Sequence, residues 1–201
     1  MFLSRMCLDI TLAETKKFIH FQSYAQQQVN SLFASAIDSL LWRIDFLNGR
    51  LWLVILSSLR PDYQKLHEKI GFQGVFPSWD IMDYSDILDN IQLHTDYSFE
   101  VCVSPLPPSV VRHSDFQHIS DIHDWFMKSG ETYGFDVESF TSIVSNWHVI
   151  NGQYILFAKI HGVLQPTDET LFHQSLTSGI GYVKTLGAGL MTVRDQYSVW
   201  Q

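Results

Sequence analysis

The chain has 201 residues, and its 46% hydrophobic content is enough for one large core or two cores of about a hundred residues each. Thirteen Lys and Arg face twenty-one Asp and Glu, and the net charge of −8 excludes a broad basic surface for nucleic acid. No apolar run reaches the ~18 residues of a membrane span, and the N-terminus does not resemble a signal peptide. We therefore expect a cytoplasmic protein with no membrane partner, in which any nucleic-acid site is local.

The first half of the chain alternates strand and helix patterns. Apolar runs predict strands over 2–10 and 51–57, a helical stretch over 17–41 and a short helix over 63–70. The segment 71–85 has the composition of a loop, and 97–103 alternates as a strand. The prolines that follow indicate a domain boundary, and they are Pro105, Pro107 and Pro108. We therefore expect domains over 1–104 and 109–201.

The second half repeats this plan. A helix is expected over 121–133, capped by Ser120 and ended by Gly134. Strands are expected over 135–144, 147–149, 154–164 and 190–193, with a hairpin turn at Asn151-Gly152, and a helix over 168–177. Each half approximates the order β-α-β-β-α-β, which RNA-recognition modules share. The sequence thus predicts an α+β fold with two tandem ferredoxin-like (RRM-like) domains.

A glycine-rich segment near the C-terminus is the best candidate for anion binding. Lys184 lies among four glycines, which are Gly179, Gly181, Gly187 and Gly189. Glycines allow backbone N–H groups to turn toward an anion, and the lysine adds a positive charge. The segment matches neither a Walker loop nor a dinucleotide fingerprint, since Val183 precedes the lysine and a helix precedes the segment. We expect a phosphate site or a turn that only packs closely, and no cofactor.

Two other patterns have simpler interpretations. No Lys or Arg occurs from Ile70 to Val111, where six Asp and Glu lie, so this segment is a solvated acidic surface or a patch for a basic partner. Histidines recur every five residues at His113, His118 and His123. Residues five apart on a helix point in different directions, unlike the i, i+4 pair of a zinc helix, so we expect no metal site.

Several segments occur in an order that resembles a known family. They are residues 1–5, the strand 40–45, the helix with Trp125-Phe126 that leads to Gly134-Phe135, the strand 162–164 and the terminal glycine segment. Together they resemble the CasE family, the CRISPR repeat-processing endoribonucleases of type I-E Cascade, over essentially the whole chain. The resemblance implies binding of the CRISPR repeat hairpin in precursor crRNA, metal-independent cleavage to a 2′,3′-cyclic phosphate, and retention with Cascade subunits as the 3′-hairpin subunit.

The resemblance also suggests catalytic residues. An ungapped comparison from Met1 places the family's catalytic histidine at His20 and puts Lys17 where the family has a tyrosine. A shifted register instead aligns Tyr24 with the tyrosine and Gln27, which cannot shuttle a proton, with the histidine. His20 as an ordinary surface histidine is the remaining alternative.

The resemblance assigns RNA contacts to Lys184 and its four glycines, with Arg112 and Lys159 as further phosphate contacts. The chain departs from the family where Glu100 and Cys102 replace basic side chains in the strand before the prolines. Fewer cations weaken RNA binding, because each phosphate contact releases counterions. A second hypothesis is therefore a catalytically inactive acidic homologue that acts as a protein-binding regulator, decoy or inhibitor of a Cascade. A third is a sensor of a small anion.

Overall fold

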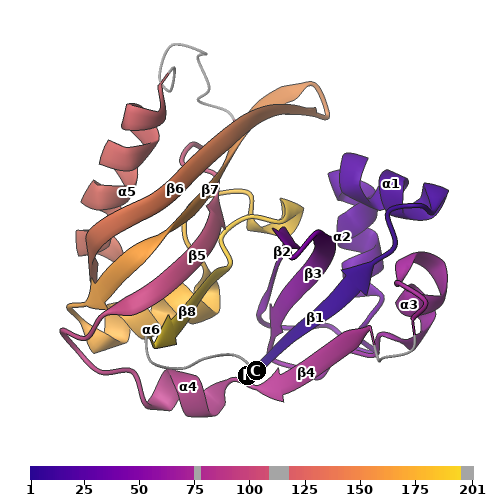
Figure 1. The fold of residues 1–201 in the computed structure, drawn as a ribbon, viewed down its shortest axis with the longest axis horizontal. Coiled ribbons are helices and arrows are strands. Elements are labelled where there is room, and N and C mark those ends of the chain that lie inside the picture. The colour runs from indigo at the N-terminus through magenta and orange to yellow at the C-terminus, as the bar shows by residue number, and fades with distance from the viewer. Residues whose placement is uncertain (75–77, 109–117, 196–201) are drawn as a thin grey trace. The chain divides into compact units, whose positions relative to one another are not determined.

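The computed structural model describes residues 1–74, 78–108 and 118–195, and the chain divides into two compact units. Unit 1 comprises Met1–Ile87 with Thr185–Gly187, and unit 2 comprises Leu88–Lys184 with Ala188–Gln201. Each unit contains one four-stranded antiparallel sheet (Figure 1). Within the described ranges, no helix has the length and apolar character needed to cross a membrane.

Unit 1 has the strand order β2-β3-β1-β4. Its elements are β1 (Phe2–Leu8), α1 (Ala13–His20), α2 (Gln22–Asn30), β2 (Leu40–Leu47), β3 (Arg50–Ser57), α3 (Gln64–Ile70) and β4 (Trp79–Asp83), followed by α4 (Ser85–Asp89). Asn48 and Gly49 both have positive φ and form the two-residue turn between β2 and β3, as expected for a twisted hairpin.

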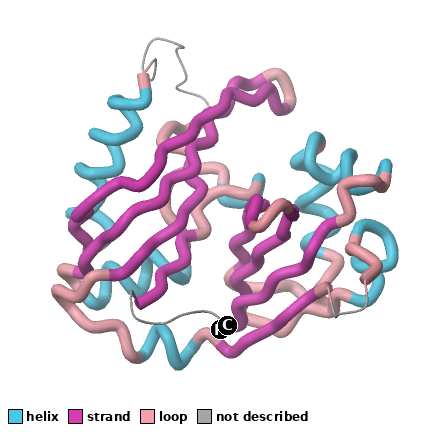
Figure 2. The backbone as a smooth tube through the Cα atoms, viewed as in Figure 1, coloured by secondary structure: helices cyan, strands magenta, loops and turns pink. Residues whose placement is uncertain are grey.

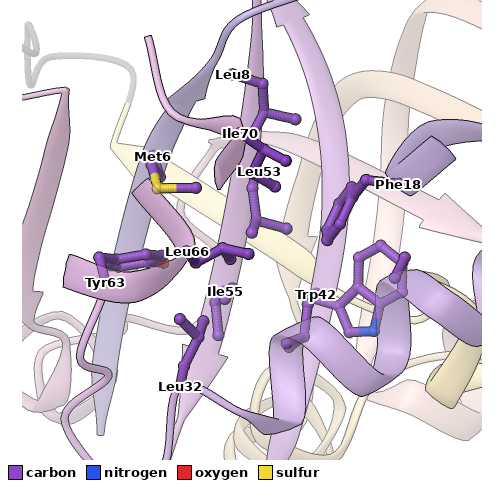
Figure 3. Packing of buried hydrophobic residues seen from close by; sticks show 12 residues of the cluster. Met6, Leu8, Phe18, Leu32, Trp42, Leu53, Ile55, Tyr63, Leu66 and Ile70 are labelled. Carbon is purple, nitrogen blue, oxygen red and sulfur yellow. The ribbon is translucent and has the colours of Figure 1, made fainter. Parts of the chain in front are cut away.

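The core of unit 1 lies between its sheet and its helices (Figure 3). Met6 and Leu8 of β1 and Leu53 of β3 point toward the helices because side chains alternate between the faces of a strand. Phe18 of α1 lies 6.1 Å from the ring of Trp42, measured between ring centroids. This packing fixes α1 on the sheet and thereby determines which residues of α1 face solvent.

Unit 2 has the strand order β6-β7-β5-β8. Its elements are β5 (Tyr97–Val103), α5 (Ile119–Tyr133), β6 (Phe135–Ile150), β7 (Gln153–Pro166), α6 (Glu169–Ser178), a 3₁₀ turn (Lys184–Leu186) and β8 (Met191–Asp195). The strands β6 and β7 form a long hairpin that runs past the ends of the other two strands (Figure 2).

An aromatic cluster fills the core of unit 2. The fully buried ring of Phe126 in α5 lies 5.4 Å from the rings of Phe99 and Phe135, measured between centroids. Gly134 ends α5 in the left-handed conformation with φ 75°, and a Cβ there would lie 2.6 Å from the carbonyl oxygen of Asp168. Only glycine fits this position, which explains why α5 ends there.

The two units share one connectivity, and the predicted fold class is confirmed. In each sheet the strands lie in the order second, third, first and fourth of that unit, with a helical segment after the first strand and another after the third. This is the ferredoxin-like arrangement. The chain is therefore α+β with two tandem ferredoxin-like units.

Several element predictions were wrong in detail. The expected helical stretch 17–41 is two helices, broken at Phe21, and the second helix ends at Asn30. Residues 40 and 41, also expected to be helical, begin the strand Leu40–Leu47, which pairs with β3. The segment 71–85, expected as a loop, contains the edge strand β4, which is held by antiparallel pairing with β1. The two strands expected over 135–149 are one strand with two register shifts.

The structure divides the chain earlier than the prolines suggest. β5 pairs with β7 and β8, so it belongs to the sheet of unit 2, whereas the expected boundary placed it in a domain over 1–104. The division lies between Ile87 and Leu88. The prolines end β5 because they cannot donate to the sheet, and they do not separate units.

Candidate functional site

One face of α1 carries the residues that were candidates for catalysis. Lys17 and His20 lie three residues apart, and Glu14 precedes Lys17 by the same spacing, so the three side chains project on one side of the helix. The sequence also suits the helix dipole, with Glu14 in the first turn and Lys17 and His20 in the last. Phe18, four residues after Glu14, is fully buried and anchors the helix in the core.

Three side chains of α1 and α2 form a connected group, here called the Glu14 cluster: Glu14, Lys17 and Tyr24. The hydroxyl of Tyr24 donates a short hydrogen bond to Oε1 of Glu14. The Nζ of Lys17 lies 3.5 Å from the same oxygen and 4.1 Å from the centroid of the Tyr24 ring. The structure thus brings together the two residues, Lys17 and Tyr24, that the alternative registers assigned to the tyrosine position.

The cluster changes the acidity of two of its members. Burial, with a further contribution from the bond to Glu14, raises the pKa of Tyr24 from 10.0 to about 12. The hydrogen bond from Tyr24, followed by smaller effects of Lys17 and of Lys69 on α3, lowers the pKa of Glu14. At neutral pH, Tyr24 is therefore a hydrogen-bond donor and Glu14 is an anion.

The two candidates for the histidine position differ in chemistry. His20 is the last residue of α1, and its side chain is exposed before the break at Phe21. Gln27 is exposed on α2, one helical turn after Tyr24. An imidazole can both donate and accept a proton near neutral pH, whereas an amide cannot, so His20 is the exposed group here that can perform acid–base chemistry.

In the glycine segment, much of the backbone is already hydrogen bonded within the protein. The N–H of Gly179 donates to Ser175, that of Gly181 to the hydroxyl of Tyr133, and that of Gly189 to Cys102. A Cβ at Gly181 would lie 2.6 Å from the carbonyl oxygen of Ser104. These glycines therefore permit close packing with φ values of 75–87°, and their N–H groups do not form the anion cradle that the sequence suggested.

Lys184 lies at the start of the 3₁₀ turn and is half-buried. Its Nζ donates a 2.7 Å hydrogen bond to the carbonyl oxygen of Ser178, the last residue of α6. Burial lowers the pKa of Lys184. The side chain thus places a cation at the C-terminus of a helix, where the helix dipole favours positive charge. Gly187 follows the turn with φ 90° and belongs to unit 1.

The other predicted phosphate contacts lie elsewhere. Lys159 is on β7, half-buried and opposite Cys102 of β5 in the register. The neighbouring pair is Glu100 and His161, with Nε2 of His161 3.8 Å from Oε1 of Glu100, so a carboxylate does occupy this face of the sheet. Arg112 lies outside the described residues. The described ranges contain no group of three or more His, Cys, Asp and Glu residues arranged to hold a metal ion.

Two arginines of unit 1 are also bound to carboxylates. The Nε of Arg43 lies 2.8 and 2.9 Å from the two carboxylate oxygens of Asp45, and both side chains are buried. Arg5 lies 3.8 Å from Asp80 and has its guanidinium 5.1 Å from the centroid of Trp52. Like Lys17, these cations are partly neutralised before any ligand binds.

Comparison with known proteins gives a family and a fold. The model of the family described as CRISPR associated protein matches residues 1–195. No curated protein sequence matches the chain significantly.

Among solved structures, the chain is similar to Cse3 of Thermus thermophilus bound to an RNA representing a pre-cleavage complex. The TM-score is 0.77 and the identity 17%, and the match covers 96% of this chain and 98% of that one. Cas6e of Escherichia coli K-12 is similar with a TM-score of 0.63, 15% identity and the same two coverages. A chain of E. coli Cascade bound to a PAM-containing double-stranded DNA target gives 0.53 and 13% over 96% and 98% of the two chains. At 13–17% identity, these likenesses establish that the fold is shared and nothing more.

Proposed function

The chain belongs to the CRISPR associated protein family, whose model covers residues 1–195, and on this premise we propose that it binds the hairpin of a CRISPR repeat RNA and cleaves precursor crRNA at the base of that hairpin. The observation that carries the proposal is the agreement of the fold with RNA-bound Cse3 over 96% of this chain. After cleavage the protein stays on the product as the 3′-hairpin subunit of a Cascade.

The proposed reaction is an intramolecular transesterification that needs no metal ion. The RNA 2′-hydroxyl attacks the adjacent phosphorus, the bond from phosphorus to the 5′-oxygen breaks, and the products carry a 2′,3′-cyclic phosphate and a 5′-hydroxyl. The 2′-hydroxyl loses its proton to solvent as it attacks, and the exposed imidazole of His20 donates a proton to the leaving 5′-oxygen and regains one from solvent. Lys17, on the same side of α1, offsets the charge that develops on the phosphate.

Binding of the RNA backbone is assigned to the lysines of unit 2 and to Arg112. Lys184 reaches the surface beside the C-terminus of α6, and Lys159 lies on a sheet face. The glycines Gly179, Gly181, Gly187 and Gly189 shape the segment that presents Lys184. Each lysine contact contributes affinity that falls with salt, because binding releases counterions from the RNA.

Cleavage of repeat RNA in EDTA tests this proposal, with wild type, His20→Ala and His173→Ala compared. His173 is an exposed histidine on α6 and provides the matched control. Wild type and the control should cleave, while His20→Ala should be slower by about 10² or more, the usual effect of losing a general acid or base. Full cleavage by His20→Ala would refute the assignment, and loss of activity in Tyr24→Phe alone would favour the shifted register.

A second candidate function is a catalytically inactive homologue that binds a protein of a Cascade. The observation that favours it is the pairing of cations in unit 1 with carboxylates, seen at Lys17, Arg5 and Arg43. Such pairing weakens contact with phosphate and leaves an acidic chain suited to a basic protein partner. Nanomolar, salt-sensitive binding of the repeat hairpin, with no Cascade protein retained in pull-downs, would contradict this candidate.

A further inference from the structure

In the Glu14 cluster, both groups that could contact a phosphate already contact one carboxylate oxygen. The hydroxyl of Tyr24 donates to Oε1 of Glu14, and the Nζ of Lys17 lies 3.5 Å from the same atom. A phosphate oxygen would use these same two donors, because carboxylate and phosphate oxygens are equivalent acceptors for an ammonium or a hydroxyl. The carboxylate therefore occupies the position that an RNA phosphate would take.

The contacts of Glu14 can be exchanged for contacts with an anion from solution. The side chains of Glu14 and Lys17 are 43% and 49% exposed, so both groups can be reached from solvent. The ring of Tyr24 holds the Lys17 ammonium at 4.1 Å from its centroid, which keeps the cation in place when the carboxylate moves.

We propose that Glu14 is an internal competitor of the RNA phosphate: it occupies Lys17 and Tyr24 in the free protein and is displaced when the cognate RNA binds. This inference rests on the proposed function and adds to it a residue that controls specificity. An RNA held by further contacts elsewhere on the protein can displace the carboxylate, whereas an RNA that meets only Lys17 must overcome the repulsion of Glu14.

The variant Glu14→Gln tests this role, because its amide oxygen still accepts from Tyr24 while the negative charge is lost. The assay is fluorescence anisotropy of a labelled repeat hairpin in which 2′-deoxynucleotides at the base of the stem prevent cleavage. At low salt the variant should bind about fivefold more tightly, as removal of one charge about 4 Å from a phosphate predicts in a watery environment. A hairpin of unrelated sequence should gain more than the repeat hairpin, so that specificity, the ratio of the two affinities, falls.

A matched control separates this effect from the change in net charge. Glu131 is an exposed glutamate on α5, and Glu131→Gln removes the same charge from unit 2. We expect its affinity for the hairpin to rise by less than that of Glu14→Gln at the same salt, because the charge that it removes contacts neither Lys17 nor Tyr24. Unchanged or weaker binding by Glu14→Gln would overturn the inference, and weaker binding would show that Glu14 organises the site.

A second readout remains informative if the proposed function fails. Should neither wild type nor the variant bind the hairpin, pyrophosphate is titrated while the ¹³Cζ resonance of Tyr24 is followed by NMR. Competition by Glu14 predicts that this resonance moves at lower pyrophosphate concentrations in Glu14→Gln than in wild type. The same concentration dependence in both proteins would contradict the inference independently of RNA.

Discussion

Replacement of Lys184 by methionine separates its structural role from its proposed role in RNA binding. Lys184 donates a 2.7 Å hydrogen bond to Ser178 at the C-terminus of α6, so the variant loses this bond and the cation beside the helix end. A hydrogen bond contributes about 0.5–1.5 kcal/mol net, and a cation at a helix C-terminus about 0.3–1 kcal/mol. We therefore expect the free energy of unfolding to fall by about 1–2 kcal/mol.

The proposed contact with RNA makes a different prediction for the same variant. If Lys184 contacts one phosphate, the slope of log K against log salt should become shallower by about 0.7–0.9. The matched control is Lys128→Met, because Lys128 is exposed on α5. We expect the control to change neither the unfolding free energy nor the slope.

The assays are urea denaturation and hairpin binding measured at several salt concentrations. A destabilised Lys184→Met with an unchanged salt slope would refute the RNA contact and leave Lys184 as a residue that stabilises the end of α6. An unchanged free energy of unfolding would refute the structural role.

Two further predictions concern the cores and the Glu14 cluster. Phe126→Ala should lower the free energy of unfolding, measured in urea, by about 3–5 kcal/mol, because its fully buried ring packs against Phe99 and Phe135. The control Phe46→Ala, at a site that is 68% exposed, should have little effect. Similar values for the two variants would contradict the packing. Folding raises the pKa of Tyr24 from 10.0 to about 12, so the stability of wild type relative to Tyr24→Phe should be constant below pH 10 and should fall as the pH rises toward 12. Urea denaturation across this pH range checks the second prediction, and a difference that does not vary with pH would argue against a protected phenol.

The repeated ferredoxin-like plan could be predicted because its signals are local. The hairpin turn at Asn151-Gly152 and the helix stop at Gly134 each depend on a residue that tolerates positive φ. The edge strand β4 could not be predicted in this way, because its five residues have little pattern of their own and pair with β1 through contacts distant in sequence. For the same reason, the strand β5 was placed with the wrong unit: its partners β7 and β8 lie far along the chain.

The candidate site was predictable only in part. The spacing of Glu14, Lys17 and His20 on one face of α1 can be read from the sequence, although Glu14 was not recognised as a functional residue. The hydrogen bond from Tyr24 to Glu14 depends on how α2 leaves the break at Phe21, which no periodicity specifies. Likewise, glycine content cannot reveal that the N–H groups of Gly179, Gly181 and Gly189 are already bonded within the protein.

The most direct test of the account is the chemical identity of the ends produced when wild-type protein meets a CRISPR repeat RNA in EDTA. Mass spectrometry of the fragments should find a 2′,3′-cyclic phosphate on the upstream product and a 5′-hydroxyl on the hairpin product. An intact RNA that is nevertheless bound, or products with a 3′-hydroxyl and a 5′-phosphate, would contradict metal-independent transesterification by this protein.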